Sequence, residues 1–265
     1  MNITIGQYYP TASPLHRMDP RMKLLGIALY ITALFIITSF WGYLFVALAL
    51  ATVIKISRVP PKFMFRGLRA ILIILVFTSL LNVFFTPGPT VLLSVGFITI
   101  TQEGVFNALR MISRLVLLIS GSSVLTLTTT PIKLTDAIEY VLKPFKRIGV
   151  PSHEIAMMMS IALRFIPTLL EEVDRIMKAQ MARGADFDTG GLIKKAKSLI
   201  PLLVPLFISA FRRADELATA MEARCYRGDI NRTKMKIMRL ESLDYKALAV
   251  MASFVALTVL LVIFT

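Results

Sequence analysis

Long uncharged stretches are the feature that most limits what this chain can fold into. Residues 24–54 carry no charged side chain, and neither do residues 70–102 or residues 247–265. A membrane-spanning helix needs about 20 mostly apolar residues, so the first stretch is long enough for two spans. With 56% hydrophobic residues, the chain is also too apolar for an ordinary soluble domain. The sequence therefore predicts an all-α polytopic membrane protein.

Turn signals divide these stretches into five spans. The sequence TSFWG at 38–42 separates the first two, and TPGPT at 86–90 ends the third, because Pro and Gly cannot continue a helix. The fifth span follows the last charged residue, Lys246. The predicted spans are residues 24–38, 41–56, 68–85, 107–127 and 246–265, and the first four form an N-terminal membrane part over residues 1–127.

The charge of the loops orients these spans. The loop 55–69 carries five Lys and Arg residues, whereas the turn 38–42 and the loop 86–104 carry none. By the positive-inside rule the first is cytoplasmic and the other two are external. Five spans then place the N-terminus and segment 128–245 in the cytoplasm and the C-terminus outside. The net charge of +14 is explained by cytoplasmic loops beside anionic lipid in the bilayer, and no nucleic acid partner is predicted.

Segment 128–245 holds 19 of the 30 Lys and Arg residues and 14 of the 16 acidic residues. Its apolar residues recur at spacings of three and four, which is typical of amphipathic helices. Three such helices are predicted, over residues 131–147, 152–182 and 192–226. Pro167 predicts a kink in the second, and Pro201 and Pro205 predict a bend in the first half of the third.

Two of these helices end in nearly the same tripeptide. The second ends in Ala182, Arg183 and Gly184, and the third ends in Ala223, Arg224 and Cys225. The short loop 184–191 predicts a crossed or hairpin pair of helices, and both tripeptides are expected in one region of space. An exposed Arg at a helix end could dock in an acidic groove of a soluble partner. Arg also offsets the macrodipole at a helix C-terminus, and the spacing alone favours this ordinary capping over docking.

The spans offer little for catalysis or conduction. No predicted span contains an acidic residue, and Arg110 and Arg114 are the charged residues of the fourth span. Arg114 is deep enough to require snorkelling or a contact with another subunit. A self-contained channel or membrane enzyme, the alternative class of function, would need convergent polar groups in the spans.

The chain also lacks the sequence signals of a metal site or an ATPase. It has one cysteine, and its two histidines, His16 and His153, are far apart in sequence, so no metal site is predicted. It has no Gly-rich loop followed by Lys-Ser or Lys-Thr, so any ATP chemistry is expected in a partner.

Four stretches resemble one known family. They are GQYYPTASPLHRMDPRMKLL at 6–25, LTLTTTPIKLTDAIEYVLKPF at 125–145, SIALRFIPTLLEEVDRIMKAQMARGADF at 160–187 and AMEARCYRG at 220–228. They are similar to the transmembrane T component of energy-coupling-factor transporters, a family that includes the cobalt-transport membrane subunits. The likeness extends over nearly the whole chain.

The resemblance implies a coupling function in a bacterial or archaeal cell membrane. The T component is not an enzyme and binds no cofactor; it joins two cytoplasmic ATPases, which bind ATP and Mg, to a small membrane S component that captures a vitamin or metal ion. Its long cytoplasmic coupling helices end in Ala-Arg-Gly motifs that insert into grooves of the ATPases. By resemblance, residues 182–184 and 223–225 are these docking motifs. The apolar faces of the coupling helices dock the S component, which implies a role for Met158, Phe165, Leu169, Leu203, Phe207 and Phe211.

Cys225 departs from the family pattern, which has Gly at this position. A left-handed helix end without Gly would cost about 1 kcal/mol, so Gly228 is an alternative stop for the helix. The difference between the two motifs fits two non-identical ATPases. The S component, of which several could be interchangeable, would choose the substrate.

Overall fold

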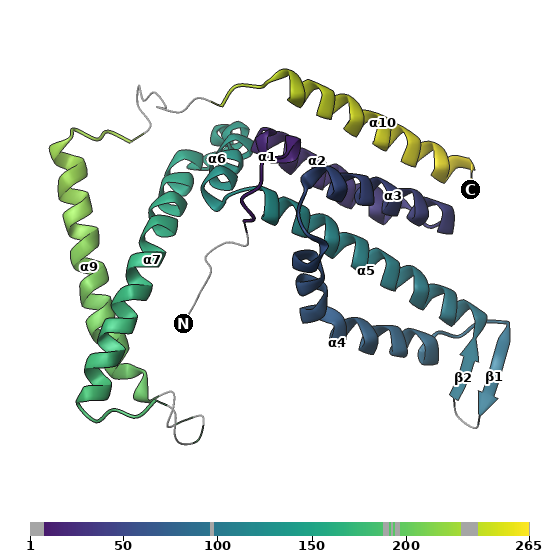
Figure 1. Ribbon diagram of the computed structural model, residues 1–265, viewed down its shortest axis with the longest axis horizontal. Coiled ribbons are helices and arrows are strands. Elements are labelled where there is room, and N and C mark those ends of the chain that lie inside the picture. The colour runs from purple at the N-terminus through teal and green to yellow at the C-terminus, as the bar shows by residue number, and fades with distance from the viewer. Residues whose placement is uncertain are drawn as a thin grey trace. The chain divides into compact units, whose positions relative to one another are not determined.

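The computed structural model describes residues 8–95, 98–187, 191, 193, 197–228 and 238–264. The chain divides into two compact units, and each is described by itself. The first comprises Met1–Ala137 and Ile237–Thr265, and the second comprises Ile138–Lys236. Helices dominate both units (Figure 1).

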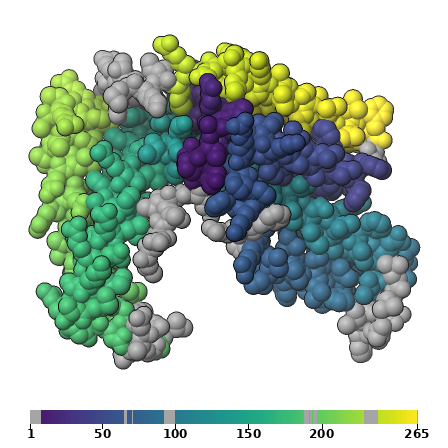
Figure 2. Space-filling model, in the orientation of Figure 1, coloured from purple at the N-terminus to yellow at the C-terminus, as the bar shows by residue number. Residues whose placement is uncertain are grey.

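The first unit is a bundle of membrane helices arranged around α5 (Gln102–Thr128), which packs against three neighbours. These neighbours are α2 (Pro20–Ile36), α3 (Phe40–Ser57) and α4 (Pro61–Phe85). The last helix, α10 (Ser242–Phe264), lies along α2 and α3, as the yellow surface in Figure 2 shows. A short helix, α1 (Pro14–Arg17), precedes α2. The loop between α4 and α5 forms an antiparallel hairpin of β1 (Val91–Val95) and β2 (Ile98–Thr101), which the sequence analysis did not predict.

The boundary between the two units falls within α6 (Pro131–Leu142), after Ala137. The second unit contains two long helices, α7 (Ser152–Ala182) and α9 (Ile200–Ala223). The predicted helix 131–147 is divided, because Pro144 has no N–H to donate and the chain tightens into a 3-10 helix, η1 (Lys143–Ile148). Pro201 lies in the first turn of α9, where its fixed φ suits a helix, and Pro205 lies inside α9. The bend predicted from these two residues stays a prediction. Residues 192 and 194–196 of the predicted third helix lie outside the described residues.

Several helices can cross a membrane. Within the described ranges, α3, α5, α7 and α10 are long and apolar enough, and α4, bent between Pro61–Arg69 and Ile71–Phe85, adds a fifth candidate. Helix α2, which covers the predicted first span, has 17 residues and is shorter than these. Helix α7 qualifies because most of its charged residues lie between Glu171 and Lys178, and only Glu154 and Arg164 precede them. The protein is thus a multi-pass membrane protein, and the cytoplasmic placement of α7 stays a prediction.

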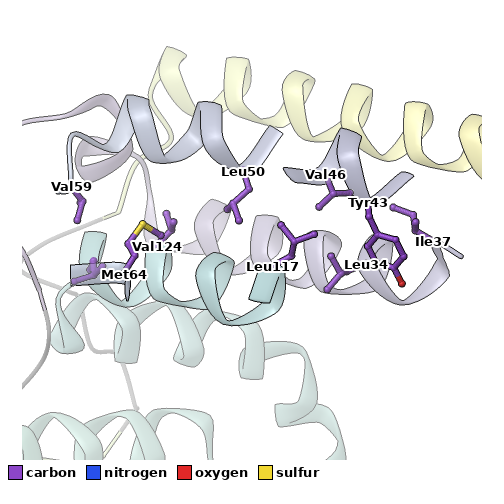
Figure 3. Packing of buried hydrophobic residues seen from close by; sticks show 10 residues of the cluster. Leu34, Ile37, Tyr43, Val46, Leu50, Val59, Met64, Leu117 and Val124 are labelled. Atoms are coloured by element: carbon purple, nitrogen blue, oxygen red, sulfur yellow. The ribbon is translucent and has the colours of Figure 1, made fainter. Parts of the chain in front are cut away.

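The core of the first unit lies between α2, α3, α4 and α5. Leu34 of α2 and Val46 of α3 are fully buried, and they share a cluster with Leu117 and Val124 of α5 and Met64 of α4 (Figure 3). In a bilayer the hydrophobic effect between helices is weak, because lipid tails are as apolar as the core. Close van der Waals packing therefore contributes more of the stability of the bundle.

Buried polar contacts fasten the start of α2 to two other helices. The Lys23 Nζ donates to the Thr128 carbonyl at 2.9 Å, at the end of α5. The backbone N–H of Asp19 donates to Asp244 Oδ1 at 2.8 Å, at the start of α10. These three helix ends therefore meet at one end of the bundle.

The segment before α1 is held by His16. Nδ1 lies 2.7 Å from Ser13 Oγ, and Nε2 lies 3.0 Å from the Tyr9 carbonyl oxygen, which can only accept. Burial lowers the pKa of His16, which favours the neutral ring that donates to Tyr9 and accepts from Ser13. Tyr9 in turn donates its backbone N–H to Leu127 at 3.0 Å. The segment is thus attached to the end of α5.

Arg114 has partners within this chain. Its Nε and one terminal nitrogen donate to the Tyr43 hydroxyl at 3.1 and 2.8 Å, and that nitrogen lies 3.4 Å from the Ile37 carbonyl oxygen. The guanidinium also lies 5.5 Å from the centroid of the Phe35 ring. Arg114 thus fastens α5 to the turn between α2 and α3, a role that neither sequence-based interpretation named. Arg110 is exposed.

Candidate functional site

The two Ala-Arg helix ends have the same backbone conformation. Helix α7 ends at Ala182 and helix α9 ends at Ala223, so Arg183 and Arg224 are the residues that cap them. The next residue is left-handed in both, with φ of 87° at Gly184 and 56° at Cys225. Cys225 is therefore the left-handed stop of α9, and the alternative stop at Gly228 is wrong.

The hydrogen bonds at the two ends also correspond. At the first end, Gly184 donates to the Met181 carbonyl and Ala185 donates to the Gln180 carbonyl, both at 3.0 Å. At the second, Cys225 donates to Glu222 at 2.8 Å and Tyr226 donates to Met221 at 3.0 Å. This is the Schellman pattern, which satisfies the last carbonyls of a helix. Two different tripeptides therefore present their Arg residues on equivalent backbones.

Cys225 occupies a backbone conformation that favours glycine. We expect Cys225→Gly to stabilise the end of α9 by about 1 kcal/mol, because glycine has no Cβ to strain the left-handed conformation. Gly184→Cys should destabilise the end of α7 by a similar amount. The cost would come from backbone strain and not from a steric clash, because a Cβ there would meet nothing within 4 Å. Amide hydrogen exchange at residues 180–185 and 221–226 measures both. Unchanged exchange at both ends would show that the left-handed position carries no such cost.

Both Ala-Arg helix ends are open to solvent. Arg183, Arg224 and the alanines before them are all exposed. In the part of the chain that the structure describes, neither guanidinium forms an ion pair or bonds to the helix carbonyls, which the Schellman pattern already satisfies. Each side chain therefore keeps its planar set of donors for a carboxylate outside the chain. Capping by side-chain hydrogen bonds does not account for these arginines.

The two ends lie at opposite ends of the second unit. Helices α7 and α9 run in opposite directions (Figure 1), with Glu172 and Arg213 forming an ion pair at 3.4 Å between them. Tyr226, just after α9, contacts Met157 near the start of α7. The 31 residues of α7 span roughly 46 Å, so the expectation that both ends share one region is wrong.

The apolar residues predicted to face an S component differ in exposure between the two helices. On α9, Leu203, Phe207 and Phe211 are exposed, and Phe211 is 73% accessible. On α7, Met158 is exposed, whereas Phe165 and Leu169 are half-buried. Helix α9 therefore offers the more open apolar face.

Three polar residues that the sequence analysis did not single out for this site meet beside the second end. His153 Nδ1 lies 3.2 Å from Glu139 Oε1, and its Nε2 lies 3.5 Å from the Tyr226 hydroxyl. The residues come from α6, α7 and the segment after α9. No short motif joins them, because they are separated by 14 and 73 positions.

Comparisons with known proteins agree with this architecture. A family model for CbiQ, the cobalt transport protein, matches residues 11–237. The chain is 57% identical to the energy-coupling factor transporter transmembrane protein EcfT of Thermosediminibacter oceani, over 92% of each chain. It is 55% identical to the protein of that name from Ruminiclostridium cellulolyticum, over 98% of this chain and 97% of the relative. The chain therefore belongs to the cobalt transport protein family and, within it, to the transmembrane proteins of energy-coupling factor transporters.

Proposed function

We propose that this chain transmits ATP-driven motion of two cytoplasmic ATPase subunits to a membrane S component that captures a vitamin or another micronutrient. The observation that carries this proposal is the pair of exposed Ala-Arg ends with equivalent backbones. Each end has an unengaged guanidinium that suits an acidic groove. The ATPases, not this chain, bind ATP and Mg and carry out hydrolysis.

The distance between the ends supports one ATPase at each. Because α7 is roughly 46 Å long, a single small groove cannot receive Arg183 and Arg224 together. Gly184 and Cys225 differ in side chain at the same backbone position. That difference suits two non-identical ATPases.

The apolar face of α9 suits the membrane partner. Leu203, Phe207 and Phe211 are exposed along it, and large exposed apolar surfaces mark protein or membrane contacts. We assign this face, together with Met158, Phe165 and Leu169 of α7, to the S component. One T component could serve several interchangeable S components through such a face.

The rival class, a self-contained channel or membrane enzyme, has less support. It would need polar groups that converge in the spans, and Arg114 is already engaged by Tyr43 and Ile37. The names of the relatives also describe a transporter's transmembrane protein.

The proposal is tested by isolating the tagged chain from its native membrane in a gentle detergent. Mass spectrometry should identify two ATPases and one or more small membrane proteins, and the latter would name the substrates. A chain that is recovered alone, or only with copies of itself, would contradict the proposal and favour the channel or enzyme.

Labelling with a membrane-impermeant thiol reagent tests the proposed topology. We expect the single native cysteine, Cys225, to be protected in intact cells because it lies in the cytoplasm. In a Cys225→Ser background, Pro89→Cys, in the exposed loop after α4, should react from outside, whereas Lys62→Cys, at the start of α4, should not. The reverse pattern at positions 62 and 89 would overturn the topology.

A further inference from the structure

The second docking end is fastened to the start of α7 by the residue that follows it. The Tyr226 hydroxyl donates to Met157 Sδ at 3.0 Å and lies 3.5 Å from His153 Nε2. Both contacts are in the first two turns of α7. Tyr226 is two residues after Arg224, and its backbone N–H completes the Schellman pattern. The position of its ring therefore sets the path of the chain beside Arg224.

His153 extends this attachment to a third helix. Its Nε2 lies 3.5 Å from the Tyr226 hydroxyl, and its Nδ1 lies 3.2 Å from Glu139 Oε1, on α6. His153 is 9% exposed, and the contacts that it and Tyr226 make are part-buried. The end of α9 is thus linked to both α6 and α7.

The first docking end has a different side chain at the same position. Ala185 occupies the place of Tyr226, with the corresponding backbone hydrogen bond to Gln180. A methyl group cannot donate to a neighbouring helix. The two ends therefore share a backbone but not this attachment.

We infer that Tyr226 is a positioning residue that holds Arg224 ready for its partner and raises affinity at the second docking end alone. The inference rests on the proposed docking of ATPases at the two ends. A helix end held in its bound position loses less freedom on binding, and affinity rises accordingly. The Arg183 end does not benefit, because it is separated from Tyr226 by the length of α7.

The test uses the full-length chain in lipid nanodiscs and the pair of ATPases recovered with it from the native membrane. Tyr226→Phe, which keeps the ring and removes the hydroxyl, should weaken ATPase binding about fivefold, the loss expected for one hydrogen bond. The loss should persist in an Arg183→Glu background and disappear in an Arg224→Glu background. A general loss of folding would not depend on which end is intact. Tyr245→Phe, at an exposed position of α10, is the matched control and should leave binding unchanged.

A double-mutant cycle tests the contact itself. Met157→Leu should weaken binding by a similar factor, and the double variant with Tyr226→Phe should be no weaker than either single variant. Additive losses, or a loss from Tyr226→Phe that is equal in both Arg backgrounds, would overturn the inference and leave docking intact. If Arg224→Glu itself leaves binding unchanged, the proposed docking at this end is overturned as well.

Discussion

Replacing Arg183 and Arg224 together by Glu should remove the ATPases from this protein, whereas either single replacement should leave them partly attached. Both guanidiniums are exposed, and a glutamate in an acidic groove replaces attraction by repulsion. Truncating one partner of a buried charge pair costs about 2–5 kcal/mol, or from about thirtyfold to a few thousandfold in affinity. Because the two ends are separated by the length of α7, the two losses should add.

Co-purification from nanodiscs or gentle detergent measures this effect, with the amount of chain in the membrane as the reference. Arg212→Glu is the matched control, because Arg212 is exposed on α9 and lies away from both ends. It should retain both ATPases. A double variant no weaker than a single variant would argue against two separate docking points, and undiminished attachment in all three would eliminate the docking role.

The local structure of the candidate site was largely readable from the sequence. Gly184 after an apolar repeat predicts a left-handed helix end, and α7 ends where that signal lies. Helix α7 also begins at Ser152, the residue at which the sequence predicts its start. Such signals act within one or two turns of a helix, so they need no knowledge of the tertiary structure.

The error about the second end was one of local energetics. Cys225 carries a strain that glycine would avoid, and Gly228 was therefore the alternative stop. The structure accepts the strain because the hydrogen bonds of Cys225 and Tyr226 satisfy two carbonyls of α9. The conformational preference of a single residue does not include these hydrogen bonds, which offset the backbone strain.

The error about the position of the two ends was one of topology. Two helices joined by a short loop and packed on each other run antiparallel, so their C-terminal ends must lie far apart. The expected hairpin of helices therefore already places Arg183 and Arg224 apart, without any further signal from single residues.

Other features depend on contacts between distant residues. The partner of Arg114 is Tyr43, 71 positions earlier, and the partner of Tyr226 is Met157, 69 positions earlier. Only the packing of the helices brings these pairs together, so one sequence could not predict them.

Gly121→Ala should destabilise the membrane bundle, whereas Gly26→Ala should not. A Cβ at Gly121 of α5 would overlap the edge of the Tyr30 ring on α2, well inside van der Waals contact. That ring cannot easily withdraw, because its hydroxyl donates to the Leu117 carbonyl at 2.8 Å. Overpacking a rigid site costs about 1–3 kcal/mol. In a protein of this size, such a loss lowers the unfolding temperature by several degrees, on the order of 2–4 °C per kcal/mol.

Gly26 is the matched control, because it is a glycine of α2 that, like Gly121 of α5, lies at a contact between helices. A Cβ there would lie 2.7 Å from Met251 Cε, the far end of a flexible side chain that can move aside. Thermal unfolding of both variants in one detergent gives the comparison. Tyr30→Leu should recover part of the loss in Gly121→Ala by removing the rigid ring. Equal losses at Gly26 and Gly121, or no recovery with Tyr30→Leu, would show that close packing of α2 on α5 at Gly121 is not what stabilises the bundle.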